Sequence, residues 1–280
     1  MIRESNKVNG IFSVILVLVV FLVVTWTFNT TVLYLLQKQF LFWNYYSHVL
    51  MVALGVGVIA LTGRNFRSYG FTLENWRSDF SIAVICVIAA SGFIPSLLFP
   101  VIASNDVLNA IFSIGATLLA LWAVLKKGSG SGKSGLTKTA TSLMALAPLF
   151  SLAAVAFGMD YPRIASTAIF QFFFAGFGEE ILFRGYLQSR LNESFGKQWK
   201  FAGVDFGPGL LITSILFGVL HLLNPFNPLV RQYALAAWSG IDSMVAGILF
   251  GFVREKTGDV LSSSLAHGLF DLGQVIPLLF

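Results

Sequence analysis

The chain alternates between long apolar blocks and short polar or glycine-rich breaks. A membrane-spanning helix needs about 20 mostly apolar residues, and the blocks approach that length. They are continuous and lack the ten-residue alternation of a membrane barrel. The pattern therefore predicts an all-α fold, a polytopic transmembrane helical bundle with about eight spans, between seven and nine. The nine candidate spans are residues 11–29, 45–62, 79–100, 106–125, 140–158, 165–190, 208–225, 232–252 and 259–280.

Composition supports this class of protein. Of 280 residues, 56% are hydrophobic and 11% are charged, and the mean hydropathy is +0.79. A soluble domain carries about 25% charged residues. We expect one integrated bundle in two parts. Residues 1–139 hold the N-terminal transmembrane spans and end in a Gly/Ser-rich cytoplasmic loop, and residues 140–280 hold the functional core.

The positions of Lys and Arg predict the orientation, because cytoplasmic loops carry an excess of both. With nine crossings and a cytoplasmic N-terminus, 14 of the 18 Lys and Arg residues fall on the inside. The first apolar run is longer than a signal-peptide core and lacks a clear cleavage site, so we interpret it as a retained span. We expect an integral protein of a bacterial inner membrane.

Several other functional classes are disfavoured by local features. The net charge of +5 is accounted for by the inside loops, so no nucleic-acid partner is expected. The loop "KKGSGSGKSGLTK" (126–138) resembles a phosphate-binding loop, but its glycine spacing is one residue short and no strand precedes it. The single cysteine, Cys86, excludes a disulfide framework within one chain and is expected to serve packing.

Ionisable residues inside spans are costly and usually have a partner or a function. Glu179 and Glu180 point about 100° apart on a helix, so they cannot do the same work. Glu180 and Arg184 stand at i and i+4, the favourable order for an ion pair, which would leave Glu179 as the unpaired carboxylate. Away from the span ends, the acidic, basic and histidine residues of the last four predicted spans are Glu179, Glu180, Arg184, His221, Asp242, His267 and Asp271.

Two of the three histidines fall in late spans. His221 follows Phe217 by four residues on one face, and a packing role is open for it. His267 precedes Asp271 by four residues, so the carboxylate can fix one imidazole nitrogen and leave the other facing a site. His48 follows interfacial aromatics, and we interpret it as an interfacial anchor. A carboxylate and two imidazoles from three helices can surround one water, and a glutamate in an apolar site suits general acid–base work.

Three motifs now stand in order on late apolar helices: EExxxR (Glu179, Glu180, Arg184), FxxxH (Phe217, His221) and HxxxD (His267, Asp271). Over residues 165–280 this set resembles the CAAX protease and bacteriocin-processing family of intramembrane proteases, which includes the Ras-converting CAAX endopeptidase. The resemblance implies an intramembrane endopeptidase.

The resemblance also implies roles for the motif residues. Glu179 activates the water, and His221, His267 and Asp271 complete the catalytic set. Glu180, Arg184 and Phe217 support that set. The family pattern has Asn or Asp at the last position. Because a carboxylate is a poor oxyanion donor unless it is protonated, we expect Asp271 mainly to orient His267.

Cofactor and partner expectations follow from the same residues. Glu179, His221 and His267 could hold zinc as three protein ligands. There is no HExxH motif, so a metal-free glutamic mechanism is favoured. The expected partners are the lipid bilayer and a membrane-associated or lipidated peptide substrate. The alternatives are a non-catalytic scaffold or bacteriocin-immunity protein and a proton-coupled transporter, although no repeated halves are visible.

Overall fold

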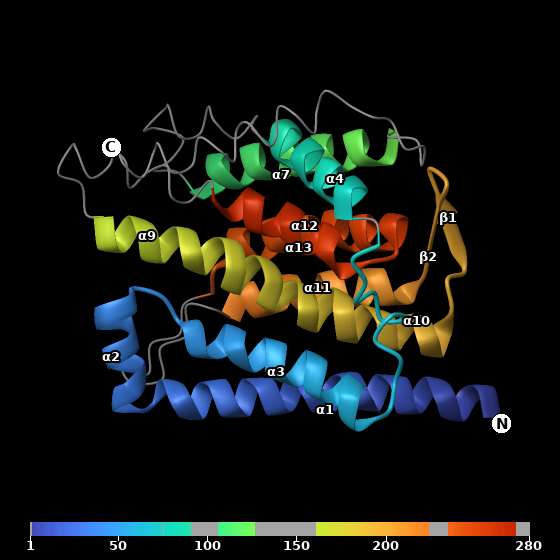
Figure 1. Cartoon of the computed structure of the whole chain (residues 1–280), viewed down its shortest axis with the longest axis horizontal. Coiled ribbons are helices and arrows are strands. Elements are labelled where there is room, and N and C mark those ends of the chain that lie inside the picture. The colour runs from blue at the N-terminus through green and yellow to red at the C-terminus, as the bar shows by residue number, and fades with distance from the viewer. Residues whose placement is uncertain (1, 75, 91–105, 127–160, 224–234, 273–280) are drawn as a thin grey trace.

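The computed structural model describes residues 2–74, 76–90, 106–126, 161–223 and 235–272 (Figure 1). The predicted span 140–158, the end of span 79–100 and almost all of the Gly/Ser-rich loop lie outside the described residues. The described helices are α1 (Ile2–Asn29), α2 (Val32–Leu41), α3 (Tyr45–Leu61), α4 (Trp76–Ala90), α7 (Asp106–Lys126), α9 (Tyr161–Ile169), η2 (Phe170–Glu179), η3 (Ile181–Gln188), α10 (Ser189–Phe195), α11 (Pro208–Leu223), α12 (Ala237–Thr257) and α13 (Val260–Asp271).

The helices stack in layers (Figure 1). Helices α1 and α3 lie side by side along one edge, and α3 packs against the central helix that carries Glu179. On the other side of this central helix lies α13, while α11 packs along α12. Helices α4 and α7 cover α12 and α13 on the far side. The helix with the two glutamates is therefore the inner layer of the bundle.

The central helix is continuous through α9, η2, η3 and α10, because the residues at each junction keep right-handed helical angles. Its middle, Phe170–Gln188, is wound as π-helix on both sides of Glu180. π-helical turns are rare and often mark functional sites. Span 165–190 was predicted as a helix without this winding. The helix ends where Gly196 adopts a φ of 78°, a conformation that glycine reaches without steric cost.

Two elements of the structure are absent from the elements predicted from the sequence. Strands β1 (Trp199–Phe201) and β2 (Val204–Phe206) pair antiparallel in a hairpin where only a loop was expected. Ala202 and Gly203 both have positive φ at its turn, which is the geometry of a tight two-residue hairpin. Helix α2 was also not predicted. It has no buried residues and lies across one end of the bundle. No stripe of buried apolar residues therefore marks it as a helix of the core.

Span length is borne out for part of the bundle. Among the described residues, the helix Asn6–Asn29 is long and apolar enough to cross a membrane, and α2 with α3 passes as a pair bent by 108°. Segment Ile111–Lys126 and helix α11 are apolar but shorter. The count of seven to nine spans stays a prediction.

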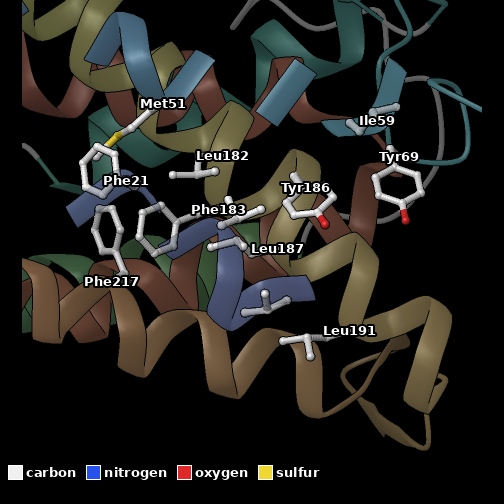
Figure 2. Packing of buried hydrophobic residues seen from close by; sticks show 12 residues of the cluster. Phe21, Met51, Ile59, Tyr69, Leu182, Phe183, Tyr186, Leu187, Leu191 and Phe217 are labelled. Atoms are coloured by element: carbon white, nitrogen blue, oxygen red, sulfur yellow. The ribbon is translucent and has the colours of Figure 1, made fainter. Parts of the chain in front are cut away.

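Two apolar clusters hold the layers together. The first lies between α1, α3, the central helix and α11 (Figure 2), and it includes Phe21, Met51, Leu182, Phe183 and Phe217. The second joins α4, α7, α12 and α13 and includes Cys86, which is fully buried. Cys86 therefore serves packing, as predicted.

Large apolar side chains also cover the outside of the bundle. On α11, Leu211, Ile215 and Val219 recur every four residues and are 40%, 53% and 41% exposed. Helices α1 and α7 carry similar outward rows, including Phe12 at 64% and Trp122 at 55%. Outward rows of large apolar side chains suit a lipid-facing surface, and large exposed apolar patches are uncommon on soluble monomers.

Cationic residues predicted on one side of the membrane gather at one end of the bundle. Lys7 lies 5.7 Å from the Phe195 ring, and Lys197 pairs with Glu255 at 2.5 Å. At the same end, Glu193 accepts hydrogen bonds from Arg64 and Arg190 at 3.2 Å each and from Tyr69 at 2.5 Å. The helix α2, with Lys38, lies at the opposite end. Alternating crossings and a cytoplasmic N-terminus stay predictions.

The Glu193 cluster generates a prediction about pH. Burial alone would raise the pKa of Glu193, but hydrogen bonds from Tyr69 and Arg64 and the charge of Arg190 lower it below its ordinary value. A lowered pKa in the folded state adds stability above about pH 4.3, and that stability is lost as pH falls through the folded value. Because Glu193 is half exposed, Glu193→Gln should cost less than about 1 kcal/mol near neutral pH.

The measurement is thermal unfolding of wild type and Glu193→Gln in detergent across a pH series. The difference in Tm should be present at neutral pH and should disappear at acid pH. An equal difference at every pH would contradict the assignment.

Candidate functional site

A buried ion pair lies at the centre of the site. Arg184 Nη1 is 2.9 Å from Glu180 Oε1, and both side chains are fully buried. Arg184 also donates to the Gly247 carbonyl on α12 at 2.9 Å, and its guanidinium lies 4.7 Å from the centre of the Phe217 ring. The predicted ion pair is present, and it ties the central helix to α11 and α12.

His267 of α13 is held between carboxylates. Its Nδ1 is 3.1 Å from Glu180 Oε1, while its Nε2 is 3.2 Å from Asp271 Oδ2 and 3.9 Å from Glu179 Oε2. The ring stacks on Phe250 at 4.5 Å. Asp271 was expected to hold one nitrogen and leave the other facing the site. That expectation is wrong, because Glu180 takes the anchoring nitrogen and Asp271 shares the nitrogen that faces Glu179.

This arrangement needs one extra proton. A neutral imidazole carries a single N–H, yet both nitrogens of His267 lie against carboxylate oxygens. Either His267 is an imidazolium that donates at both nitrogens, or one of the two carboxyl groups, Glu180 or Asp271, is protonated and donates to the nitrogen that it faces. In each case the ring is fixed and its Nε2 side faces Glu179.

His221 reaches the same carboxylate from α11. Its Nδ1 donates to the Phe217 carbonyl at 2.9 Å, and its ring lies 4.5 Å from the Phe217 ring. Its Nε2 is 3.9 Å from Glu179 Oε2. Although His221 sits in the last turn of α11, it lies level with Glu179. The structure therefore brings Glu179, His221 and His267 together from three separate helices.

His48 is the residue that the sequence interpretation missed. Its Nε2 lies 3.1 Å from Glu179 Oε1, and its side chain is 12% exposed. The interpretation as an interfacial anchor is wrong, because His48 faces the site from α3. The available signal was that the chain has only three histidines, and the other two were already assigned to the site. Its neighbours "FWNYYS" gave no reason to pair α3 with the central helix.

A cavity with both polar and apolar side chains in its lining borders this part of the site. It has a volume of about 120 Å³ and lies between α1, α3, the central helix and α11. Glu179, His48 and His221 line it, together with Thr25 and Asn29 of α1. For Asp242 the sequence leaves two roles open: it could line a cavity, or it could make a structural hydrogen bond. It hydrogen-bonds Ser113 and does not line this cavity.

The residues that the structure describes include the three predicted zinc ligands. No group of three or more His, Cys, Asp or Glu residues in this part of the chain has an arrangement that could hold a metal ion. The predicted zinc ligands Glu179, His221 and His267 lie with both Nε2–Oε2 separations at 3.9 Å. Whether the site works with or without zinc therefore stays a prediction.

The site is thus a buried glutamate that faces imidazoles inside an apolar helical bundle. Residues 161–273 match the family model of the Type II CAAX prenyl endopeptidase Rce1-like proteins, so this segment is similar to that family. The family is one of membrane-embedded proteases, in agreement with the resemblance seen in the motifs. Comparison with curated proteins and with solved structures gives no significant match to either.

The matched segment contains all three motifs and excludes α1 and α3. It therefore covers Glu179, His221, His267 and Asp271, but it does not cover His48 or the α1 side of the cavity. The family match accounts for part of the observed site, and the N-terminal helices complete its surroundings.

Close backbone packing places His267, and this generates a second prediction. A Cβ on Gly176 would lie 2.5 Å from Gly268 Cα, next to His267, in contact with backbone that cannot swing aside. Gly176→Ala should therefore push α13 from the central helix and cost about 1–3 kcal/mol. Thermal unfolding measures the loss.

The matched control is Gly57→Ala on α3, where a Cβ meets nothing within 4 Å. This change should leave stability unchanged or raise it by up to about 1 kcal/mol, the helix propensity difference. Equal Tm values for Gly176→Ala and wild type would show that the η2–α13 contact is looser than described.

Proposed function

We propose that the protein is an intramembrane endopeptidase that hydrolyses a peptide bond of a membrane-associated substrate through water activated by Glu179. One observation carries the proposal. Glu179 Oε2 is buried, has no hydrogen-bond partner among the described residues, and faces the Nε2 atoms of His221 and His267 at 3.9 Å. That separation is too long for a direct hydrogen bond and leaves room for a bridging water.

The hydrogen-bond roles at His221 favour activation of that water. Because Nδ1–H of His221 donates to the Phe217 carbonyl, Nε2 of the neutral ring is an acceptor. A water between Glu179 Oε2 and His221 Nε2 can donate one hydrogen to each. This orientation points an oxygen lone pair away from both acceptors, toward a scissile carbonyl.

The steps follow general acid–base chemistry. Glu179 takes a proton from the water as the oxygen attacks the carbonyl carbon, and a tetrahedral intermediate with an oxyanion forms. His267, as an imidazolium held by Glu180 and Asp271, stabilises the developing negative charge. Protonated Glu179 then gives the proton to the leaving amine, and Glu179 returns to its carboxylate form.

The supporting residues act through these groups. Glu180 pairs with Arg184 and at the same time holds Nδ1 of His267. Asp271 orients the same ring at Nε2. Phe217 contributes its carbonyl to His221 and its ring to Arg184. None of these four residues needs to touch the substrate.

The setting limits the substrate class. The site lies within apolar helices whose outer surfaces suit lipid, so the scissile bond must reach it from a membrane-associated or lipidated peptide. We propose a bacterial inner-membrane location with the N-terminus in the cytoplasm, on the distribution of Lys and Arg over the two ends of the bundle.

The central prediction concerns two variants. Glu179→Gln and His221→Ala should each lower cleavage of a peptide library by about 10²–10⁴-fold, because general acid–base groups contribute that much. The assay uses purified protein in detergent with mass-spectrometric detection of products. Asp205→Asn, in the exposed hairpin, is the control and should cleave as wild type does.

Cleavage by both site variants at the wild-type rate would sink the proposal, as would a wild type that cleaves nothing in the library. A scaffold or immunity protein would give the second result. A proton-coupled transporter would instead show substrate uptake that Glu179→Gln abolishes.

Metal removal tests the favoured mechanism. We expect protein treated with a chelator to retain its full cleavage rate and to contain no stoichiometric zinc by elemental analysis. Loss of cleavage that only zinc restores would replace the metal-free mechanism with one in which Glu179, His221 and His267 bind the ion.

A further inference from the structure

His48 contacts the proposed general base from a helix outside the family match. Its Nδ1 faces the Asn44 carbonyl and the Ser47 hydroxyl at 3.1 Å each, and its Nε2 faces Glu179 Oε1 at 3.1 Å. A carboxylate oxygen only accepts, so Nε2 of His48 donates to Glu179 Oε1, while Nδ1 has both the Ser47 hydroxyl and the Asn44 carbonyl within reach. The ring is therefore hydrogen-bonded at both nitrogens and cannot swing away without losing both contacts.

The packing of α3 on the central helix is built for this contact. A Cβ on Gly178 would lie 3.1 Å from the His48 carbonyl oxygen and 3.3 Å from its Cβ. About one turn further along the central helix, the Ile181 carbonyl oxygen would lie 3.1 Å from a Cβ on Gly55 of α3. Two glycines, one on each helix, thus allow the backbones to approach on both sides of Glu179. The His48 ring also meets Phe170 edge-on at 4.7 Å.

The two oxygens of Glu179 are divided between different neighbours. Oε1 is held by His48, while Oε2 faces His221 and His267. A carboxylate with one oxygen fixed cannot rotate, so the other oxygen keeps one direction. The fixed direction of Oε2 is toward the two histidines that the proposed reaction uses.

We propose that His48 is a positioning residue of the peptidase site, and that it fixes Glu179 through Oε1 so that Oε2 is presented to the hydrolytic water. This inference rests on the proposed function. It extends the site beyond residues 161–273 and makes α3 a part of it.

The neighbouring cavity separates this role from that of a membrane anchor. His48 lines the cavity of about 120 Å³ together with Thr25 and Asn29. Thr25 Oγ1 and Asn29 Oδ1 are buried and have no hydrogen-bond partner among the described residues. A cavity needs only about 10–15 Å³ and a few polar partners to hold a water, so this one accommodates several beside Glu179. An anchor would face lipid, whereas His48 faces this cavity.

The first test does not depend on activity. The chain has three histidines, so protein labelled with ¹⁵N-histidine gives three imidazole spin systems, which single substitutions assign. Glu179→Gln should shift the Nε2 signal of His48 as well as those of His221 and His267. Asp205→Asn, remote from all three rings, should shift none. A His48 signal that is the same in wild type and Glu179→Gln would overturn the proposal.

The second test uses cleavage. His48→Ala should lower kcat by about 100-fold, the order expected when a reacting group is misplaced by about 1 Å, and should leave KM nearly unchanged. His48→Gln should recover part of the loss, because its amide can donate to Oε1. Tyr46→Phe, on the same helix and stacked on Phe28, is the control and should match wild type.

The two tests separate the possible failures. If wild type cleaves nothing while the His48 signal responds to Glu179→Gln, the peptidase function fails although the contact is real, and the positioning role fails with it. If wild type cleaves and His48→Ala has the wild-type kcat, the positioning role alone is overturned. A change confined to KM would also overturn it, since it would assign His48 to substrate binding.

Discussion

The ion pair between Glu180 and Arg184 is the interaction on which the rest of the site depends. Both side chains are fully buried, and removing either partner would leave an isolated charge at a cost of about 3–5 kcal/mol. The pair is also a junction between helices. Glu180 holds His267 of α13, and Arg184 reaches α12 through the Gly247 carbonyl and α11 through the Phe217 ring. Through these contacts the buried pair fixes which helices are neighbours and how they are positioned along their axes relative to one another.

Around that junction the site has two halves of different origin. The C-terminal helices carry the motif residues and match a known protease family over residues 161–273. The N-terminal helices α1 and α3 lie outside that match, yet they form one wall of the cavity and bring His48 to Glu179. The N-terminal helices are therefore part of the surroundings of Glu179 as well as part of the bundle.

The sequence predicted the features that depend on local pattern. Apolar blocks located most of the described helices, and motif spacing identified Glu180–Arg184 and the convergence of Glu179, His221 and His267. It missed features set by distant contacts. His48 is 131 residues from Glu179, and no local pattern reports which helices become neighbours. The hairpin depends on two positive φ angles in a short polar loop, and α2 has no buried face that periodicity could detect.

Residues 170–188 are wound as π-helix, and the number of residues in this segment matters as well as their identity. A helix turns by a fixed angle per residue, about 100° in the α form, so each residue counted between Phe170 and Gln188 sets the direction in which later side chains project. Losing one residue here would rotate Arg184 away from its partners even if every motif letter were retained. This helix should therefore tolerate substitutions more readily than insertions or deletions. A chain in which the spacing of the EExxxR motif is altered would not place its arginine against the same partners.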